Sequence, residues 1–204
     1  RYDINNPSWE DRDRLILSIG HTAPVLYASL AEAGFFPKDE CMTLRKIGSR
    51  LQGHPSKDSE LPGVETSAGS LGQGLGIAIG MALSAKMDDK NYRTYCVMGD
   101  GELQEGSVWE AAMAASNYRL DNLCAIIDRN RLQIDGSTES VMALEPLDEK
   151  WTSFGWNVVE IDGHDHNDIV DAFDVARATK GQPTLILANT IMGKGVKSIE
   201  NENK

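Results

Sequence analysis

Two oxygen-bearing side chains stand at matching places thirty positions apart in this 204-residue chain. Asp100 comes directly after an apolar run, 95–98, and Gly99, and Asn130 comes shortly after a second run, 123–127. Carboxylate and amide oxygens are hard ligands that suit Mg²⁺ or Ca²⁺ and suit zinc poorly. Because Mg²⁺ commonly completes its coordination with phosphate oxygens and water, the pattern predicts a metal-bridged diphosphate as the occupant.

The elements around these two residues predict that they face one crevice. Both apolar runs are typical of buried parallel strands, and the segment 105–118 carries apolar residues at helical spacing, so the three form a βαβ unit. A crossover of this kind is right-handed and brings both strand carboxyl ends to one edge of the sheet, where ligands of open α/β sheets bind. Gly99 and Gly101 would let the backbone approach an anion closely.

The same residues resemble a known family. Gly-Asp-Gly followed at this interval by Asn is the thiamine-diphosphate motif, and GDGELQEG with DRNRLQIDG is similar to its transketolase version. The resemblance covers nearly the whole chain. It implies an α/β fold, a parallel sheet with helices on both faces, in which 1–204 is a single diphosphate-binding domain and the family's pyrimidine-binding and C-terminal domains are absent.

The resemblance implies a cofactor, thiamine diphosphate, and a divalent cation, Mg²⁺ or Ca²⁺. Asp100, Gly101 and Asn130 would bind the cofactor, and Asp100 and Asn130 would ligate the metal. The backbone carbonyl of Leu132 matches the position of the third protein ligand. That last assignment depends on the motif alone, because side-chain chemistry cannot support it.

Two histidines and one glycine-rich loop also match the family. His21, in LSIGHTAPVLYASL, would touch the cofactor's phosphate, and His54, in GSRLQGHP, would reach the reacting end of the sugar. The residues alone leave plainer alternatives open, a capping histidine for His21 and a solvated loop histidine for His54. The resemblance places the loop Gly69, Ser70 and Leu71 against the aminopyrimidine ring, with Ser70 where the family has Pro. The run 69–76 lacks the spacing of a dinucleotide fingerprint.

Two glutamates of the central helix have two interpretations. Glu105 and Glu110 are five positions apart and do not share a helix face. Taken alone, Glu105 complements the helix dipole and Glu110 is solvated. In transketolases the matching glutamates lie at a subunit interface and link two active sites, a catalytic role. The apolar neighbours of Glu110, Trp109 and Ala111, favour burial in such an interface.

The rest of the chain alternates between helical and strand patterns. We expect helices at 22–33, 38–46, 72–86, 149–154 and 167–179, strands at 157–161 and 184–190, and loops at 48–69 and 136–148. The acidic and histidine cluster 162–166 is interpreted as a strand-to-helix turn rather than a second metal site. Exposed apolar surface at Trp109, Met113 and the helix 72–85 predicts a homodimer or a heterotetramer.

Composition excludes several classes of partner. The net charge of −11 argues against nucleic acid or an anionic membrane as the main partner. No apolar run approaches membrane-spanning length and no signal peptide is visible. Cys41, Cys96 and Cys124 have no metal-like spacing and are interpreted as reduced residues, two of them in the core, of a cytoplasmic protein.

The implied reaction is transfer of a two-carbon ketol unit from a ketose phosphate to an aldose phosphate, as in the pentose phosphate pathway. The family's activating glutamate, its phosphate-binding arginines and two of its histidine segments have no counterpart here. We therefore expect the N-terminal subunit of a split transketolase, dependent on a C-terminal subunit that carries the pyrimidine domain. Two alternatives stay open: a split thiamine enzyme for a sulfonated or branched sugar phosphate, and a non-catalytic regulatory subunit that binds a nucleotide or a metal.

Overall fold

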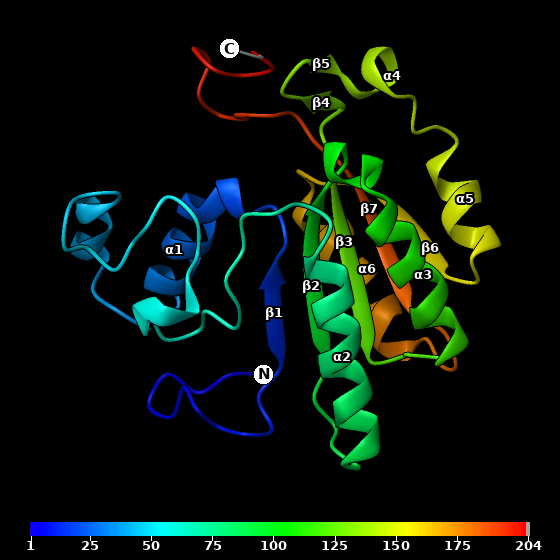
Figure 1. Ribbon diagram of the computed structural model, residues 1–204, viewed down its shortest axis with the longest axis horizontal. Helices are drawn as coiled ribbons and strands as arrows, with labels where there is room; N and C mark the ends of the chain where they lie inside the picture. Colours follow the sequence, from blue (N-terminus) through cyan, green and yellow to red (C-terminus); the bar gives the residue numbers. More distant parts are fainter. Residues whose placement is uncertain (203–204) are drawn as a thin grey trace.

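A five-stranded parallel sheet forms the centre of the molecule (Figure 1). The computed structural model describes residues 1–202. The spatial order is β1-β2-β3-β7-β6, with β1 at Arg14–Leu17, β2 at Thr94–Gly99, β3 at Leu123–Arg129, β6 at Asn157–Asp162 and β7 at Thr184–Asn189. All four neighbouring pairs are parallel. The carboxyl ends of β2 and β3 therefore meet at one edge, as the βαβ interpretation requires.

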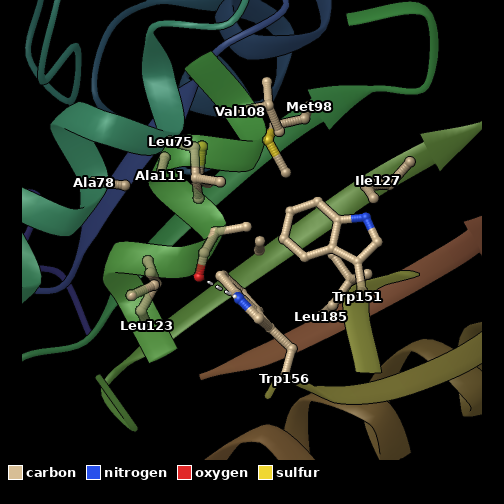
Figure 2. Close-up of a cluster of buried hydrophobic side chains, with 14 of the residues drawn as sticks. Leu75, Ala78, Met98, Val108, Ala111, Leu123, Ile127, Trp151, Trp156 and Leu185 are labelled. Atoms are coloured by element: carbon tan, nitrogen blue, oxygen red, sulfur yellow. Dashed lines mark hydrogen bonds between the residues drawn. The ribbon is translucent and has the colours of Figure 1, made fainter. Parts of the chain in front are cut away.

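One face of the sheet is covered by α2 (Gly74–Met87), α3 (Gly106–Asn117) and α5 (Leu147–Ser153). Alternate residues of the strands point into this layer, where they meet two enclosed tryptophans, Trp151 and Trp156 (Figure 2). The Trp156 indole donates a hydrogen bond of 2.9 Å to the carbonyl of Ala112, so the polar edge of the ring is satisfied inside the apolar core.

The opposite face is covered by α1 (Ala23–Glu32) beside β1 and by α6 (His166–Ala178) behind β6 and β7 (Figure 1). Their buried side chains pack on the remaining set of strand residues, such as Leu17 under α1 and Ile186 under α6. Covering both faces explains why the strands are continuously apolar rather than alternating. The predicted α/β class, a parallel sheet with helices on both faces, is confirmed.

Several short elements gather above the carboxyl edge of the sheet. They are the 3₁₀ helices η1 (Gly20–Thr22) and η4 (Gly101–Gln104), the small hairpin of β4 (Leu132–Gln133) and β5 (Gly136–Ser137), and α4 (Thr138–Val141). The predicted loop 136–148 was wrong in this respect, because it contains β5, α4 and the start of α5. Ser137 caps α4 by accepting a hydrogen bond from the Ser140 N–H, a signal that the short segment hides.

The other predicted elements agree with the structure to within a residue or two, with one exception. The helix expected at 38–46 is only a 3₁₀ turn, η2 (Lys38–Thr43). It ends there because Arg45 adopts a positive φ of 60° and donates its backbone N–H to the carbonyl of Leu51. The predicted loop 48–69 has one short 3₁₀ turn, η3 (Lys57–Ser59). Among residues 1–202, no helix has both the length and the apolar character needed to cross a bilayer.

The three cysteines should differ sharply in reactivity. Burial raises the pKa of the Cys124 thiol to about 12 and holds that of Cys96 well above its ordinary value, whereas Cys41 is partly exposed. Because the thiolate is the reactive form, a thiol reagent at about pH 8 should label Cys41 quickly and the other two only after unfolding. Mass spectrometry of labelled peptides measures this. A Cys41→Ser control should leave no fast phase, and fast labelling of Cys96 or Cys124 in the folded protein would contradict this core.

Candidate functional site

The register between β2 and β3 sets the geometry of the site. Gly99 pairs with Asp128, so the residues that follow, Asp100 and Arg129, lie side by side at the carboxyl edge. Each of these two side chains is only 1% exposed, and the Arg129 Nη1 atom is 2.9 Å from the Asp100 Oδ2 atom. The site is therefore built on an ion pair that the protein encloses.

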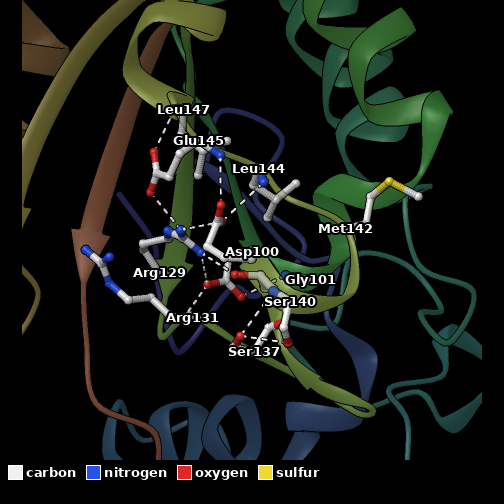
Figure 3. Close-up of polar contacts among 12 residues, drawn as sticks. Asp100, Gly101, Arg129, Arg131, Ser137, Ser140, Met142, Leu144, Glu145 and Leu147 are labelled. Carbon is white, nitrogen blue, oxygen red and sulfur yellow. Dashed lines mark hydrogen bonds and ion pairs between the residues drawn. The ribbon is translucent and has the colours of Figure 1, made fainter.

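Asp100 is almost fully engaged by its surroundings (Figure 3). Its Oδ2 atom accepts hydrogen bonds from Arg129 Nη1 and from the Arg131 N–H at 2.6 Å, and its Oδ1 atom accepts one from the Gly101 N–H at 2.7 Å. Burial raises the pKa of Asp100, and the Arg129 guanidinium and the two backbone N–H groups oppose that rise. These donors favour the ionised form that a cation would need.

The turn after β3 lies directly against the loop that holds Asp100. Asn130 shapes this turn: its Oδ1 atom accepts the Leu132 N–H at 2.9 Å, and its amide donates to the Asp128 carboxylate at 2.9 Å. Arg131, between them, adopts a positive φ of 67°, uncommon for a residue with a side chain. A Cβ atom on Gly101 would lie 3.7 Å from the Leu132 carbonyl oxygen. The structure thus brings Asp100, Asn130 and Leu132 to one place.

A second buried carboxylate, Glu102, connects this loop to two other segments. It is 2% exposed and accepts hydrogen bonds from the Ser18 hydroxyl, from the Gly72 N–H at 2.7 Å and from the Gly99 N–H at 3.2 Å. Ser18 in turn accepts the Gly74 N–H, the first amide of α2, at 3.1 Å. Burial raises the pKa of Glu102, and these donors oppose the rise. Glu102 therefore fixes the ends of β1 and β2 relative to the loop before α2.

The glycine-rich loop and both predicted histidines lie at this same edge. A Cβ atom on Gly20 would be 2.8 Å from the backbone carbon of Ala68, so the turn bearing His21 packs tightly on the loop that begins at Gly69. The His54 ring also lies beside Gly69, with Cδ2 3.9 Å from the place of a Cβ atom there. Both histidines are exposed, as is Ser70. Leu71 packs on the core under α1 and anchors the loop.

The two predicted glutamates of the central helix are both exposed in the single chain. Glu105 precedes α3 in an extended conformation, and its side-chain stem lies over Gly72, where an added Cβ atom would come within 2.7 Å of it. Glu105 is thus the residue before the helix rather than part of its first turn. Glu110 lies further along α3. Their burial in an interface stays a prediction.

The cluster 162–166 has the capping role that its sequence predicts. Asp165 accepts the backbone N–H groups of Asn167 and Asp168 at the start of α6. His164 Nε2 accepts the Ile191 N–H at 2.8 Å. Within residues 1–202, no group of three or more His, Cys, Asp or Glu side chains is arranged to hold a metal. A cation at Asp100 would accordingly take one carboxylate from this chain, and its other ligands would be neutral oxygens.

The residues at Asp100 fit a metal-bridged diphosphate. Three of the roughly four acceptor positions of the carboxylate are filled by protein donors, which leaves one on Oδ1. The neighbouring oxygen atoms of Asn130 and Leu132 are the hard ligands that Mg²⁺ prefers. Gly99 and Gly101 are packed so closely that added Cβ atoms would come within 2.8 Å of Ile19 and Gln133. The backbone therefore has no room for side chains where an anion would approach.

Sequence reasoning missed three residues of the site: Glu102, Ser18 and Arg129. Nothing in the spacing distinguishes Glu102 from a solvated loop glutamate, and Ser18 is one residue in an apolar run. Arg129 ends a buried strand, which was a usable signal, because an arginine in such a run needs an acidic partner.

Comparison with known proteins gives a consistent result. The family model described as "Transketolase, thiamine diphosphate binding domain" matches residues 1–204. One of the two subunits of an apulose-4-phosphate transketolase, from Phocaeicola vulgatus, is 48% identical, over 96% of this chain and 69% of its own length. The 6-deoxy-6-sulfo-D-fructose transketolase subunit SqwG of Clostridium sp. is 46% identical, over 99% of this chain and 73% of its own.

Complete transketolases match over a smaller share of their length. Human transketolase is 46% identical over 99% of this chain, which spans only 32% of the human protein. Among solved structures, the transketolase of Campylobacter jejuni superposes with a TM-score of 0.93 at 33% identity, covering all of this chain and 33% of that one. The shared fold therefore includes the whole described sheet and its helices.

Replacing Glu102 tests the second carboxylate. In Glu102→Gln an amide NH₂ takes the place of one acceptor oxygen, so a buried donor loses its partner and the free energy of unfolding should fall by about 1 to 3 kcal/mol. Denaturant unfolding measures this. Glu149→Gln is the matched control, because Glu149 is exposed and its side chain makes no hydrogen bond or ion pair within the described chain. Equal stability of the two variants would contradict the structural role of Glu102.

Proposed function

Since this chain belongs to the transketolase family and matches its thiamine-diphosphate-binding domain over its whole length, we propose that it is the diphosphate-binding subunit of a two-subunit transketolase. The complete enzyme would transfer a two-carbon ketol unit from a ketose phosphate to an aldose phosphate. The single observation that carries the proposal is the enclosed Asp100 carboxylate with one acceptor position left, beside the hard oxygen ligands of the turn after β3.

In this proposal Asp100, Asn130 and the Leu132 carbonyl hold Mg²⁺, and the cation holds the diphosphate of thiamine diphosphate. Gly101 and the backbone at the start of η4 allow the diphosphate to approach closely. The bound cofactor would supply the carbanion chemistry that ketol transfer needs. The family match to a thiamine-diphosphate-binding domain supports the identity of the cofactor.

The other residues of the edge would orient the cofactor and the sugar. The loop Gly69 to Leu71 would pack against the aminopyrimidine end, and His21 would donate a hydrogen bond to the diphosphate. His54, exposed next to Gly69, would exchange protons with substrate hydroxyls. Glu105 and Glu110 would act between subunits rather than on the sugar, and we propose a homodimer or a heterotetramer in which α3 lies at a contact.

The need for a partner subunit is supported by the lengths of the relatives. This chain spans about a third of complete transketolases, as for human transketolase, but 69% and 73% of two relatives whose names describe them as subunits. None of the described residues is placed to serve as a general acid or base beside the aminopyrimidine ring. We propose that the partner's pyrimidine domain supplies that group.

A substrate other than an ordinary pentose phosphate is the second candidate, and the names of two relatives favour it. One is named for apulose 4-phosphate, a branched sugar, and the other for a sulfonated fructose. The residues of this chain that would face the sugar are few, and His54 is the main one. Competing donors offered to the assembled enzyme, with product analysis by mass spectrometry, would decide between the two substrate classes.

Loss of the proposed metal ligand should weaken cofactor binding. In Asp100→Ala the cation loses its one carboxylate ligand, so the affinity for thiamine diphosphate in the presence of Mg²⁺ should fall by about 10- to 100-fold or more. Isothermal titration on the assembled protein measures this. Asp171→Ala, on the exposed side of α6, is the control and should bind as the unaltered protein does. Undiminished affinity in Asp100→Ala would refute the proposed site.

Activity should depend on the partner. The diphosphate-binding chain assayed alone should show no ketol transfer, and addition of the pyrimidine-domain subunit should restore it with a stoichiometric midpoint. A coupled assay across a titration of the partner measures this. Full activity without the partner would contradict the two-subunit proposal, and binding of ATP in place of thiamine diphosphate would favour a regulatory role instead.

A further inference from the structure

Arg129 is the largest charged side chain enclosed in the described chain. It ends β3 with a side chain 1% exposed and contacts four groups through its two terminal nitrogens (Figure 3). Nη1 donates to Asp100 Oδ2 and, at 2.8 Å, to the Thr138 hydroxyl. Nη2 donates to Glu139 at 3.1 Å and to Glu145 at 2.7 Å. Its Nε atom is buried without a partner among the described residues, so the guanidinium is oriented by its fork and not by maximal hydrogen bonding.

The groups around Arg129 prevent it from turning away from Asp100. Glu139 also accepts the Leu144 N–H at 3.2 Å, and Glu145 also accepts the Leu147 N–H at 2.9 Å. Both glutamates are thus fixed by the backbone of the segment that crosses over the site from α4 to α5. A guanidinium held at two edges by planar carboxylates has one orientation, because its donors form a rigid fork.

This orientation determines which oxygen of Asp100 a cation can reach. The Oδ2 atom accepts from Arg129 and from the Arg131 N–H, which fills both of its acceptor positions. The Oδ1 atom accepts only from the Gly101 N–H and keeps one position. A cation bound here would therefore be ligated through Oδ1 alone.

We propose that Arg129 is a positioning residue that restricts Asp100 to one-oxygen ligation and so makes the site select Mg²⁺ over Ca²⁺. The inference rests on the proposed function, in that a cation at Asp100 bridges to a diphosphate. Mg²⁺ takes six ligands in strict octahedral geometry, whereas the larger Ca²⁺ takes six to eight and readily accepts both oxygens of one carboxylate. Denying the second oxygen disfavours Ca²⁺ and leaves Mg²⁺ unaffected.

A purely structural role for Arg129 would have a different signature. Removing one partner of a buried ion pair destabilises the fold, because the remaining charge is left uncompensated. It would also make the site more negative, which would strengthen the binding of both divalent cations alike. The ratio of the two cation affinities cancels this shared effect, since Mg²⁺ and Ca²⁺ carry the same charge. Only the loss of a ligation constraint changes the ratio.

The experiment uses the full natural chain assembled with its partner and saturated with thiamine diphosphate. Mg²⁺ and Ca²⁺ are titrated separately by calorimetry into the unaltered protein, Arg129→Met/Glu145→Gln and Arg129→Lys. The double variant removes one carboxylate together with the guanidinium, which limits the uncompensated charge. Its preference for Mg²⁺ over Ca²⁺ should fall by roughly tenfold, in the range seen when groups that orient metal ligands are lost. Glu145→Gln alone keeps the Arg129–Asp100 contact and is the matched control.

Arg129→Lys keeps the proposal testable if the double variant does not fold. An ammonium is a point charge without a fork, so it cannot hold Asp100 and both glutamates at once, and the Mg²⁺ preference should fall in the same direction but less. An unchanged ratio in every variant that folds would overturn the proposal, even if both affinities or the thermal stability changed. Failure of the unaltered assembly to bind thiamine diphosphate with either cation would instead refute the proposed function.

Discussion

The structure depends on keeping an ionised carboxylate inside the protein at the point where two parallel strands end. The register Gly99 to Asp128 brings Asp100 against Arg129, and the helices that cover the sheet remove both from water. A buried charge is tolerated only when it is paired and hydrogen-bonded. The turn of 130–132, with its left-handed Arg131, and the crossing segment from α4 to α5 are both folded in the way that supplies these donors and acceptors.

The two buried carboxylates of the site do different work because their hydrogen bonding differs. Glu102 accepts from the ends of β1 and β2 and from the loop before α2, and it is covered by the backbone it joins. It holds together segments far apart in the sequence and has no free edge toward the surface. Asp100 has a similar number of donors, but they leave one acceptor position on Oδ1. A difference of one lone pair separates a structural carboxylate from a metal ligand.

The sequence alone predicted the sheet, the helices on both faces and the convergence of Asp100 with Asn130, because these follow from apolar periodicity and from the geometry of parallel strands. It could not predict that Glu102 is buried, since burial there comes from Ser18 and Gly72, residues that lie 84 and 30 positions away. It also missed the hairpin and α4 within 132–141, whose elements are too short to show a period. Contacts between distant segments carry no local signal.

The charge around Asp100 makes cofactor binding conditional on the metal. Arg129 and the three carboxylates it contacts, Asp100, Glu139 and Glu145, carry a formal charge of −2, in a chain whose net charge is −11. A diphosphate approaching this group would meet repulsion from fixed negative charges in a partly desolvated place. A divalent cation at Oδ1 offsets that charge and presents coordination positions to phosphate oxygens. Arg129 thus lowers the negative charge enough for the carboxylate to stay buried, and leaves enough of it to require the cation before the diphosphate.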